Sequence, residues 1–172
     1  MQNVIISGDV GERILTETVI KACARNGGAF VIDGKRVYET ESEPKFCVVT
    51  DVERISCSCI VILGDDVKNT AFDEDDITVI VNSENMKALE ILKYQGCKNV
   101  ITCSLNVRAS MNISGIYPQK IVSLQRTVKF NGKDIEPCEF EIVSDETDIY
   151  SLLAASAVML LSGEDIREKY FI

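Results

Sequence analysis

Short apolar runs alternate with amphipathic stretches along roughly the first hundred residues of the chain. Each run is rich in Val and Ile and is bounded by polar residues or glycine, which is typical of a strand buried on both faces. The predicted strands are 3–6, 29–32, 46–49, 59–63, 77–81 and 99–103. Between them, apolar residues recur at helical spacing over about 12–26 and 83–95. This alternation predicts an α/β fold, with a mostly parallel sheet flanked by helices.

Polar signals mark how these elements begin and end. Asp33-Gly34 predicts a hairpin into a further strand at 35–38. Asn82 or Ser83 is expected to cap the second helix, and Gly96 to end it. The segment 65–76 holds six acidic residues and one Lys, so we expect a solvated loop there.

The pattern changes after residue 111. Short segments at 112–117, 121–124, 127–130 and 140–143 alternate with turns, and Asn131-Gly132 is a hairpin signal. This predicts a small antiparallel β-sheet within 112–143, inserted into the α/β core. A last helix is expected from about 145–148 to Ser162-Gly163, and it is apolar on nearly every side, so it should be deeply packed. No linker or repeat interrupts the chain, which predicts one domain over 1–172.

Charge and composition exclude several function classes. The chain of 172 residues carries 18 basic and 27 acidic side chains, a formal charge of −9. Such a balance argues against binding of nucleic acid and against docking on anionic membranes. Histidine is absent from the sequence, which excludes Ser-His-Asp and Cys-His catalysis, His-ligated zinc and any histidine general base.

Seven cysteines and the absence of a signal-peptide pattern predict a cytoplasmic protein with reduced thiols. The pair Cys57-x-Cys59 could ligate a soft metal, but it lacks a second pair, so we interpret both as buried strand cysteines. The acidic run 73–76 could hold a divalent cation, but consecutive carboxylates on a loop point apart and mainly aid solubility. We therefore expect no metal.

The segment between the first strand and the first helix has the position and glycine spacing of a phosphate-binding loop. In such loops backbone N–H groups approach phosphate at the positive helix end, and a Lys reaches the outer phosphates. Gly8 and Gly11 stand at the expected places, but Glu12 occupies the Lys position and Arg13 that of the Mg²⁺-holding hydroxyl. A pair of unit charges at about 4 Å is worth about 4 kcal/mol at an effective dielectric of about 20, so repulsion in place of attraction disfavours a triphosphate. We expect Glu12 to set its own carboxylate at the helix N-terminus, which makes this segment a structural turn.

The order of these features resembles the central, ATP-binding domain of the Mur ligase family, which includes folylpolyglutamate synthase. The segments that carry the resemblance are the loop itself, Val48-Val49-Thr50-Asp51-Val52, Val79-Ile80-Val81-Asn82, the stretch 106–113 and the stretch 148–158. The resemblance implies an ancestor that used ATP and Mg²⁺ to activate a carboxylate and join it to an amine. It also implies a link to cell-wall or folate metabolism. It also implies that the chain is the central domain alone.

Position by position, the resemblance implies a degenerate nucleotide site. The family loop reads Gly-Thr-x-Gly-Lys-Thr, whereas this chain has Gly8, Asp9, Val10, Gly11, Glu12 and Arg13. Of the family's Asn-Ala-Asp-Asp only Asn82 is kept, and Thr147, Asp148 and Ser151 fall where the family has His and Asn nucleotide contacts. No equivalent of the metal-binding Glu or the modified Lys is found, so no catalytic residue and no cofactor are assigned.

Three functions stay open at this level. The preferred hypothesis is a non-catalytic binding or assembly protein with a dead ATP site. The alternatives are a small-metabolite sensor, which would use the cleft at the strand ends, and one subunit of a split ATP-dependent carboxylate-amine ligase. Asp148 is interpreted as a helix cap and Tyr150 as a core residue.

Association is also expected. If apolar surfaces that the resembled family buries between domains persist here, a partner should cover them, and a homodimer is the commonest solution. The expected contact is the antiparallel region 112–143 or the tail 166–172, whose last residues are Tyr170-Phe171-Ile172. The alternative is that this tail folds back onto its own core.

Overall fold

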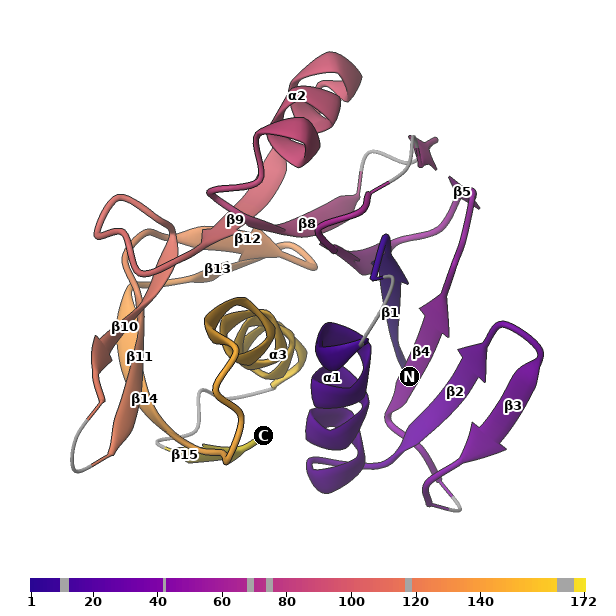
Figure 1. The fold of residues 1–172 in the computed structure, drawn as a ribbon, viewed down its shortest axis with the longest axis horizontal. Coiled ribbons are helices and arrows are strands. Elements are labelled where there is room, and N and C mark those ends of the chain that lie inside the picture. Colours follow the sequence, from indigo (N-terminus) through magenta and orange to yellow (C-terminus); the bar gives the residue numbers. More distant parts are fainter. Residues whose placement is uncertain (10–12, 42, 68–69, 74–75, 117–118, 164–168) are drawn as a thin grey trace.

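A computed structural model describes residues 1–9, 13–41, 43–67, 70–73, 76–116, 119–163 and 169–172 (Figure 1). Its helices are α1 (Ile14–Arg25), α2 (Met86–Gln95) and α3 (Ile149–Ser162). The strands are β1 (Gln2–Ser7), β2 (Ala29–Asp33), β3 (Arg36–Glu39), β4 (Phe46–Thr50), β5 (Arg54–Ile55), β6 (Cys59–Leu63), β7 (Ala71–Phe72), β8 (Ile77–Asn82), β9 (Asn99–Cys103), β10 (Met111–Gly115), β11 (Lys120–Leu124), β12 (Val128–Phe130), β13 (Lys133–Ile135), β14 (Cys138–Val143) and β15 (Lys169–Phe171).

Eleven of the described strands form one sheet in the order β15-β14-β11-β10-β9-β8-β6-β1-β4-β2-β3. The six strands from β9 to β2 are parallel to their neighbours. Within this block β6 is buried along its whole length, as its continuous apolar run predicts. The sequence-based prediction of an α/β fold with a mostly parallel sheet is therefore confirmed.

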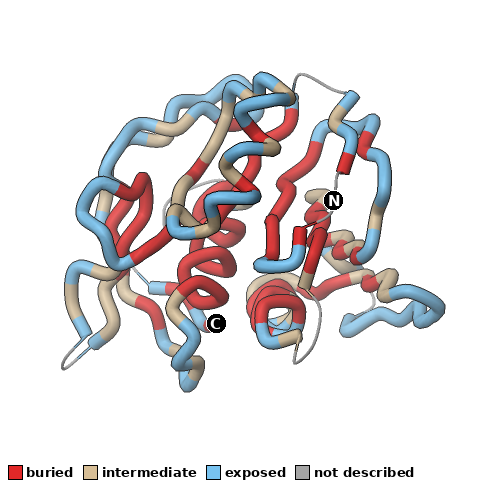
Figure 2. The backbone as a smooth tube through the Cα atoms, turned by 45° about the horizontal axis from the view of Figure 1, so that its top comes forward, coloured by how far each residue is buried: buried red, intermediate tan, exposed pale blue. Residues whose placement is uncertain are grey.

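Helices cover both faces of the sheet. Helices α1 and α3 pack against each other on one face, inside the curve of the sheet, and α2 lies on the other face (Figure 1). Twelve of the fourteen residues of α3 are buried, and the helix in the centre of Figure 2 is red on nearly every side. This agrees with its uniformly apolar sequence.

The antiparallel region lies where the sequence predicts it, within about 111–143. Strands β10, β11 and β14 pair antiparallel, and β12 and β13 form a separate hairpin that turns at Asn131-Gly132. The three longer strands continue the main sheet instead of forming a sheet of their own, because Met111 of β10 pairs with Cys103 at the end of β9. They curve around α3 and cover it (Figure 1).

Three local predictions are wrong. The acidic segment 65–76 is not a fully solvated loop, because Val67 and Thr70 are buried and β7 pairs with β5. The cap of α2 is Asn85, whose side chain accepts from the N–H of Ala88 at 3.0 Å, and not Asn82 or Ser83. Cys57 is exposed because β6 begins only at Cys59.

The end of the described chain folds back onto its own sheet. Strand β15 pairs parallel with β14, and Tyr170 and Ile172 are buried. The Arg25 guanidinium donates to the carbonyl of Ile172 at 2.7 Å, which ties this segment to α1. None of the described helices has the length and apolarity needed to cross a membrane.

Candidate functional site

A cavity of about 310 Å³ lies at the carboxyl ends of β1, β6 and β8. In parallel sheets this edge is where ligands usually bind, because the loops that leave the strands converge there. The residues that line the cavity come from the loops after β1, β6 and β8 and from the first turns of α1 and α3. They are Gly8, Asp9, Arg13, Ile14, Leu15, Gly64, Asp65, Asp66, Asn82, Asp148, Tyr150 and Ser151.

Two glycines allow the loops after β1 and β6 to touch. Gly8 has φ +83°, and a Cβ added there would lie 2.5 Å from the backbone of Val67. A Cβ added at Gly64 would lie 2.5 Å from the carbonyl oxygen of Gly8. Gly8 thus allows two segments of the protein backbone to pack closely together. In a phosphate-binding loop, the glycine at this position would instead let a phosphate approach the backbone.

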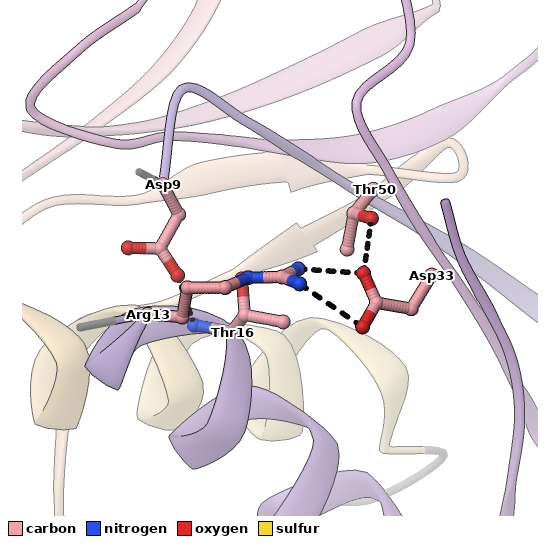
Figure 3. A network of polar contacts seen from close by, with 5 residues as sticks. All are labelled: Asp9, Arg13, Thr16, Asp33 and Thr50. Carbon is pink, nitrogen blue, oxygen red and sulfur yellow. Dashed lines mark hydrogen bonds and ion pairs between the residues drawn. The ribbon is translucent and has the colours of Figure 1, made fainter. Parts of the chain in front are cut away.

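Asp9 occupies the anion position at the N-terminus of α1. Its carboxylate accepts a hydrogen bond of 2.7 Å from the N–H of Thr16, the third residue of the helix (Figure 3). The N–H groups at a helix N-terminus are the donors that a bound phosphate would need. Here the Asp9 carboxylate accepts from one of them, and its negative charge interacts favourably with the helix dipole. The sequence prediction gave this role to Glu12, which lies with Gly11 outside the described residues.

Arg13 is held by a bidentate ion pair. Its guanidinium donates to the two carboxylate oxygens of Asp33 at 3.0 and 2.6 Å, and Asp33 also accepts from the Thr50 hydroxyl at 2.8 Å (Figure 3). The hydrogen bond from Arg13 lowers the pKa of Asp33, and the Asp33 carboxylate in turn raises the pKa of Arg13. Arg13 itself is the cap of α1 at φ 57°, a left-handed conformation. Its charge is therefore already matched within the protein.

The first turn of α3 forms the opposite wall. The carboxylate of Asp148 accepts from the N–H of Ser151 at 2.8 Å, which confirms its prediction as a helix cap. The buried Tyr150 hydroxyl donates to the carbonyl of Leu63 at 2.5 Å and lies 3.3 Å from that of Ile80. Burial raises the pKa of Tyr150 well above its ordinary value, so the hydroxyl remains a donor. Tyr150 thus fixes α3 to the ends of β6 and β8.

The lining is strongly acidic. The aspartates are Asp9, Asp65, Asp66 and Asp148, and Arg13 is the one cation among the described lining residues. Because Arg13 is already paired with Asp33, the aspartates leave a net negative cavity that repels a polyphosphate. Among the described residues no group of three or more Cys, Asp or Glu has the arrangement of a metal site.

The structure brings together most of the predicted site residues. Gly8, Asp9, Arg13, Asn82, Asp148 and Ser151 line the one cavity, whereas Thr147 is exposed and its N–H donates to Glu146. The sequence prediction missed Asp33 and Gly64. It interpreted Tyr150 as a core residue, which its burial confirms, although the residue also lines the cavity. Gly64 directly follows a predicted strand, as Gly8 nearly does, and this shared placement is the signal that could have found it.

Comparison with known proteins places the fold. No protein-family model and no curated protein matches the sequence. Among solved structures, a UDP-N-acetylmuramoyl-L-alanyl-D-glutamate–2,6-diaminopimelate ligase matches 94% of this chain with a TM-score of 0.59 and 11% identity. E. coli FolC in complex with DHPP and ADP matches 97% (TM-score 0.53, 9% identity), and a MurF ligase from Thermotoga maritima in complex with ADP matches 96% (TM-score 0.53, 8% identity).

The match is to part of each of these proteins. This chain covers 45% of the diaminopimelate ligase, 54% of FolC and 46% of MurF. Structural similarity over nearly the whole of this chain confirms the resemblance in fold to Mur ligases and FolC.

Proposed function

We propose that this chain is a Mur-ligase-like domain that carries out no ATP-dependent ligation and acts as a binding or assembly protein. The observation that carries the proposal is the carboxylate of Asp9 on the N–H of Thr16. A nucleotide phosphate would have to displace that carboxylate and then face the remaining aspartates of the cavity.

Two further features support the proposal. Arg13 is the described cation closest in sequence to the phosphate position, and two of its guanidinium N–H groups donate to the two carboxylate oxygens of Asp33. Thr147, at the place of a nucleotide contact in the resembled family, does not line the cavity. The seven free cysteines fit a reducing compartment, so we place the protein in the cytoplasm. We also treat residues 1–172 as one domain.

Calorimetric titration with Mg²⁺-ATP tests the absence of nucleotide binding. We expect no saturable heat from the native protein, because the anion position is occupied. A dissociation constant in the micromolar range would overturn the proposal and favour a residual or split ligase.

A charge-neutral variant tests the cause. Asp9→Asn keeps a side-chain oxygen for the Thr16 N–H and removes one negative charge, so pyrophosphate should bind the variant more tightly than it binds the native protein. Asp134→Asn on the exposed part of β13 makes the same charge change far from the cavity and should have no effect. Equal pyrophosphate affinity in all three proteins would contradict the role given to Asp9.

The size of the cavity favours a second candidate, the binding of a small molecule. A space of about 310 Å³ at the carboxyl ends of parallel strands suits a small ligand, and its aspartates suit a neutral or cationic one. Native mass spectrometry of protein purified from cells, compared with the denatured mass, distinguishes the two candidates. A reproducible adduct that is lost in Ser151→Trp would favour a sensor, and a mass free of adducts favours the assembly protein.

A further inference from the structure

Strand β3 is an edge of the large sheet. It follows β2 through a tight turn, pairs within the described sheet with β2 alone, and all four of its residues are exposed. Both views place this strand at one margin of the molecule, away from the helices (Figures 1 and 2). An open edge of this kind presents unpaired backbone N–H and C=O groups to any strand that can reach it.

The hairpin register shows which backbone groups are open. Asp33 pairs with Arg36 across the two-residue turn, and Val31 pairs with Tyr38. In such a hairpin these are the hydrogen-bonded pairs, and the bond from the Thr40 N–H to the Ala29 carbonyl continues the alternation. The N–H and C=O groups of Val37 and Glu39 therefore point away from β2, toward the free edge.

The sheet face beside this edge is apolar, and none of the described helices covers it. Side chains on β2 and β4 alternate, and Val31 and Val48 are buried in the core formed with α1 and α3. Their neighbours on the opposite face are only half-buried and belong to neither core cluster of the described residues; they are Phe30, Ile32, Cys47 and Val49. Val37, opposite Ile32, extends this face to the edge and is 61% exposed.

The edge is complementary to itself. When two copies of β3 run antiparallel about a two-fold axis through Val37, Val37 faces Val37 of the second copy. Lys35, in the turn directly before β3, then lies beside its Glu39 at the end of the pair. Arg36 then faces Tyr38, a contact of a cation with an aromatic ring. Opposite charges face each other twice, apolar residues meet in the middle, and the open groups of the two Val37 residues bond reciprocally.

Neighbouring registers are less favourable. A two-fold axis through Tyr38 would set Val37 against Glu39, and an axis through Arg36 would set Arg36 against Arg36 of the second copy, both basic. Like charges directly opposite destabilise a strand pair, so the charges select the register centred on Val37.

We propose that this protein forms a two-fold homodimer in which β3 pairs with β3 of a second copy, so that the sheet and its uncovered apolar face run through both subunits. The occupant of this edge is thus a second copy of the chain. The proposal is independent of the cavity at the strand ends. It also differs from the contacts expected from the sequence, which lie in 112–143 or in the tail; of the tail, Tyr170 and Ile172 are buried within the subunit.

Light scattering coupled to gel filtration of the full chain tests the dimer. We expect a mass of twice 19.0 kDa, which falls toward the monomer on dilution. Val37→Pro removes an N–H that points to the free edge and that β2 does not use, so the hairpin should persist and the dimer should be lost. Val37→Thr keeps that N–H and a strand-forming side chain, so this matched control should remain dimeric.

A charge exchange tests the register. Glu39→Lys sets two lysines against each other in the dimer and should weaken association at least about tenfold. The double variant Lys35→Glu with Glu39→Lys restores opposite charges and should restore the dimer. Circular dichroism confirms that each variant is folded. A native protein that is monomeric at high concentration would overturn the proposal, and so would a dimer that all these variants leave unchanged.

Discussion

The guanidinium of Arg13 and the carboxylate of Asp33 form two parallel hydrogen bonds, which join the start of α1 to the end of β2. Asp33 also accepts from the hydroxyl of Thr50, the last residue of β4. One carboxylate thus holds three elements together beside the candidate site. The cation that could have attracted an anionic ligand serves the stability of the fold instead.

Asp33→Asn should lower the free energy of unfolding by about 1–2 kcal/mol at neutral pH, because the charged hydrogen bonds to Arg13 become neutral ones. The pKa of Asp33 is lowered in the folded protein, so the unfolded chain binds more protons and stability rises with pH. The contribution is complete above the ordinary value of 3.8 and disappears as the pH falls through the lower folded value.

Urea unfolding at neutral pH and at about pH 3 measures this difference. The variant and the native protein should be closer in stability at the acidic pH. A loss of equal size at both pH values would contradict the ion pair as its cause.

Tyr150→Phe should cost about 1–2 kcal/mol of unfolding free energy, because the carbonyls of Leu63 and Ile80 would be left in a buried place without their donor. Thermal or urea unfolding measures the loss. Tyr94→Phe removes the same atom from a side chain that is 93% exposed and should change stability little. Equal effects of the two substitutions would contradict the role assigned to the Tyr150 hydroxyl.

Gly64→Ala should destabilise the protein by about 1–3 kcal/mol, because its methyl group would lie 2.5 Å from the carbonyl oxygen of Gly8. Gly132→Ala is the comparison, since its Cβ would meet nothing within 4 Å. That substitution carries only the cost of φ +74°, about 1 kcal/mol. The denaturant midpoint should therefore fall further in Gly64→Ala than in Gly132→Ala. A smaller loss of stability in Gly64→Ala would contradict the close contact of the two loops.

Thiol labelling of the native protein should modify Cys57 first, because it is exposed. Cys23 and Cys103 are buried, and burial raises the pKa of each thiol, so they should react only when the protein unfolds. Burial likewise raises the pKa of Cys59 to about 12. Cys57→Ser should abolish the fast phase, and fast labelling of Cys23 or Cys103 would contradict the packing described here.

Elements whose residues are buried on both faces could be predicted from the sequence. Strands β6 and β8 and helix α3 have continuous apolar runs that exclude a solvent-facing side, so the place and length of each run predict its position and type. The cap of α2 did not follow, because Asn82, Ser83 and Asn85 are all good caps. Only the folded chain shows that Asn82 accepts from the N–H of Glu84 while Asn85 caps the helix.

The candidate site was predictable in position and not in its contacts. Glycines after a strand mark the loop, and local spacing brings Asp9 near Thr16. The partner of Arg13 lies twenty residues away on another strand, and no local pattern connects it to the loop. Cys57 was misassigned because it was grouped with Cys59, although it lies two residues before the predicted strand 59–63, which is where β6 begins.

The packing of α1 against α3 has a consequence for the order in which the protein can fold. Synthesis proceeds from the N-terminus, so β1, α1 and the parallel strands emerge from the ribosome before residues 149–162. Until then, the side of α1 that α3 will cover has no partner. Contacts across so many residues slow folding, and the apolar sheet face is exposed in the meantime. The nascent chain is therefore expected to need chaperone protection until α3 has emerged.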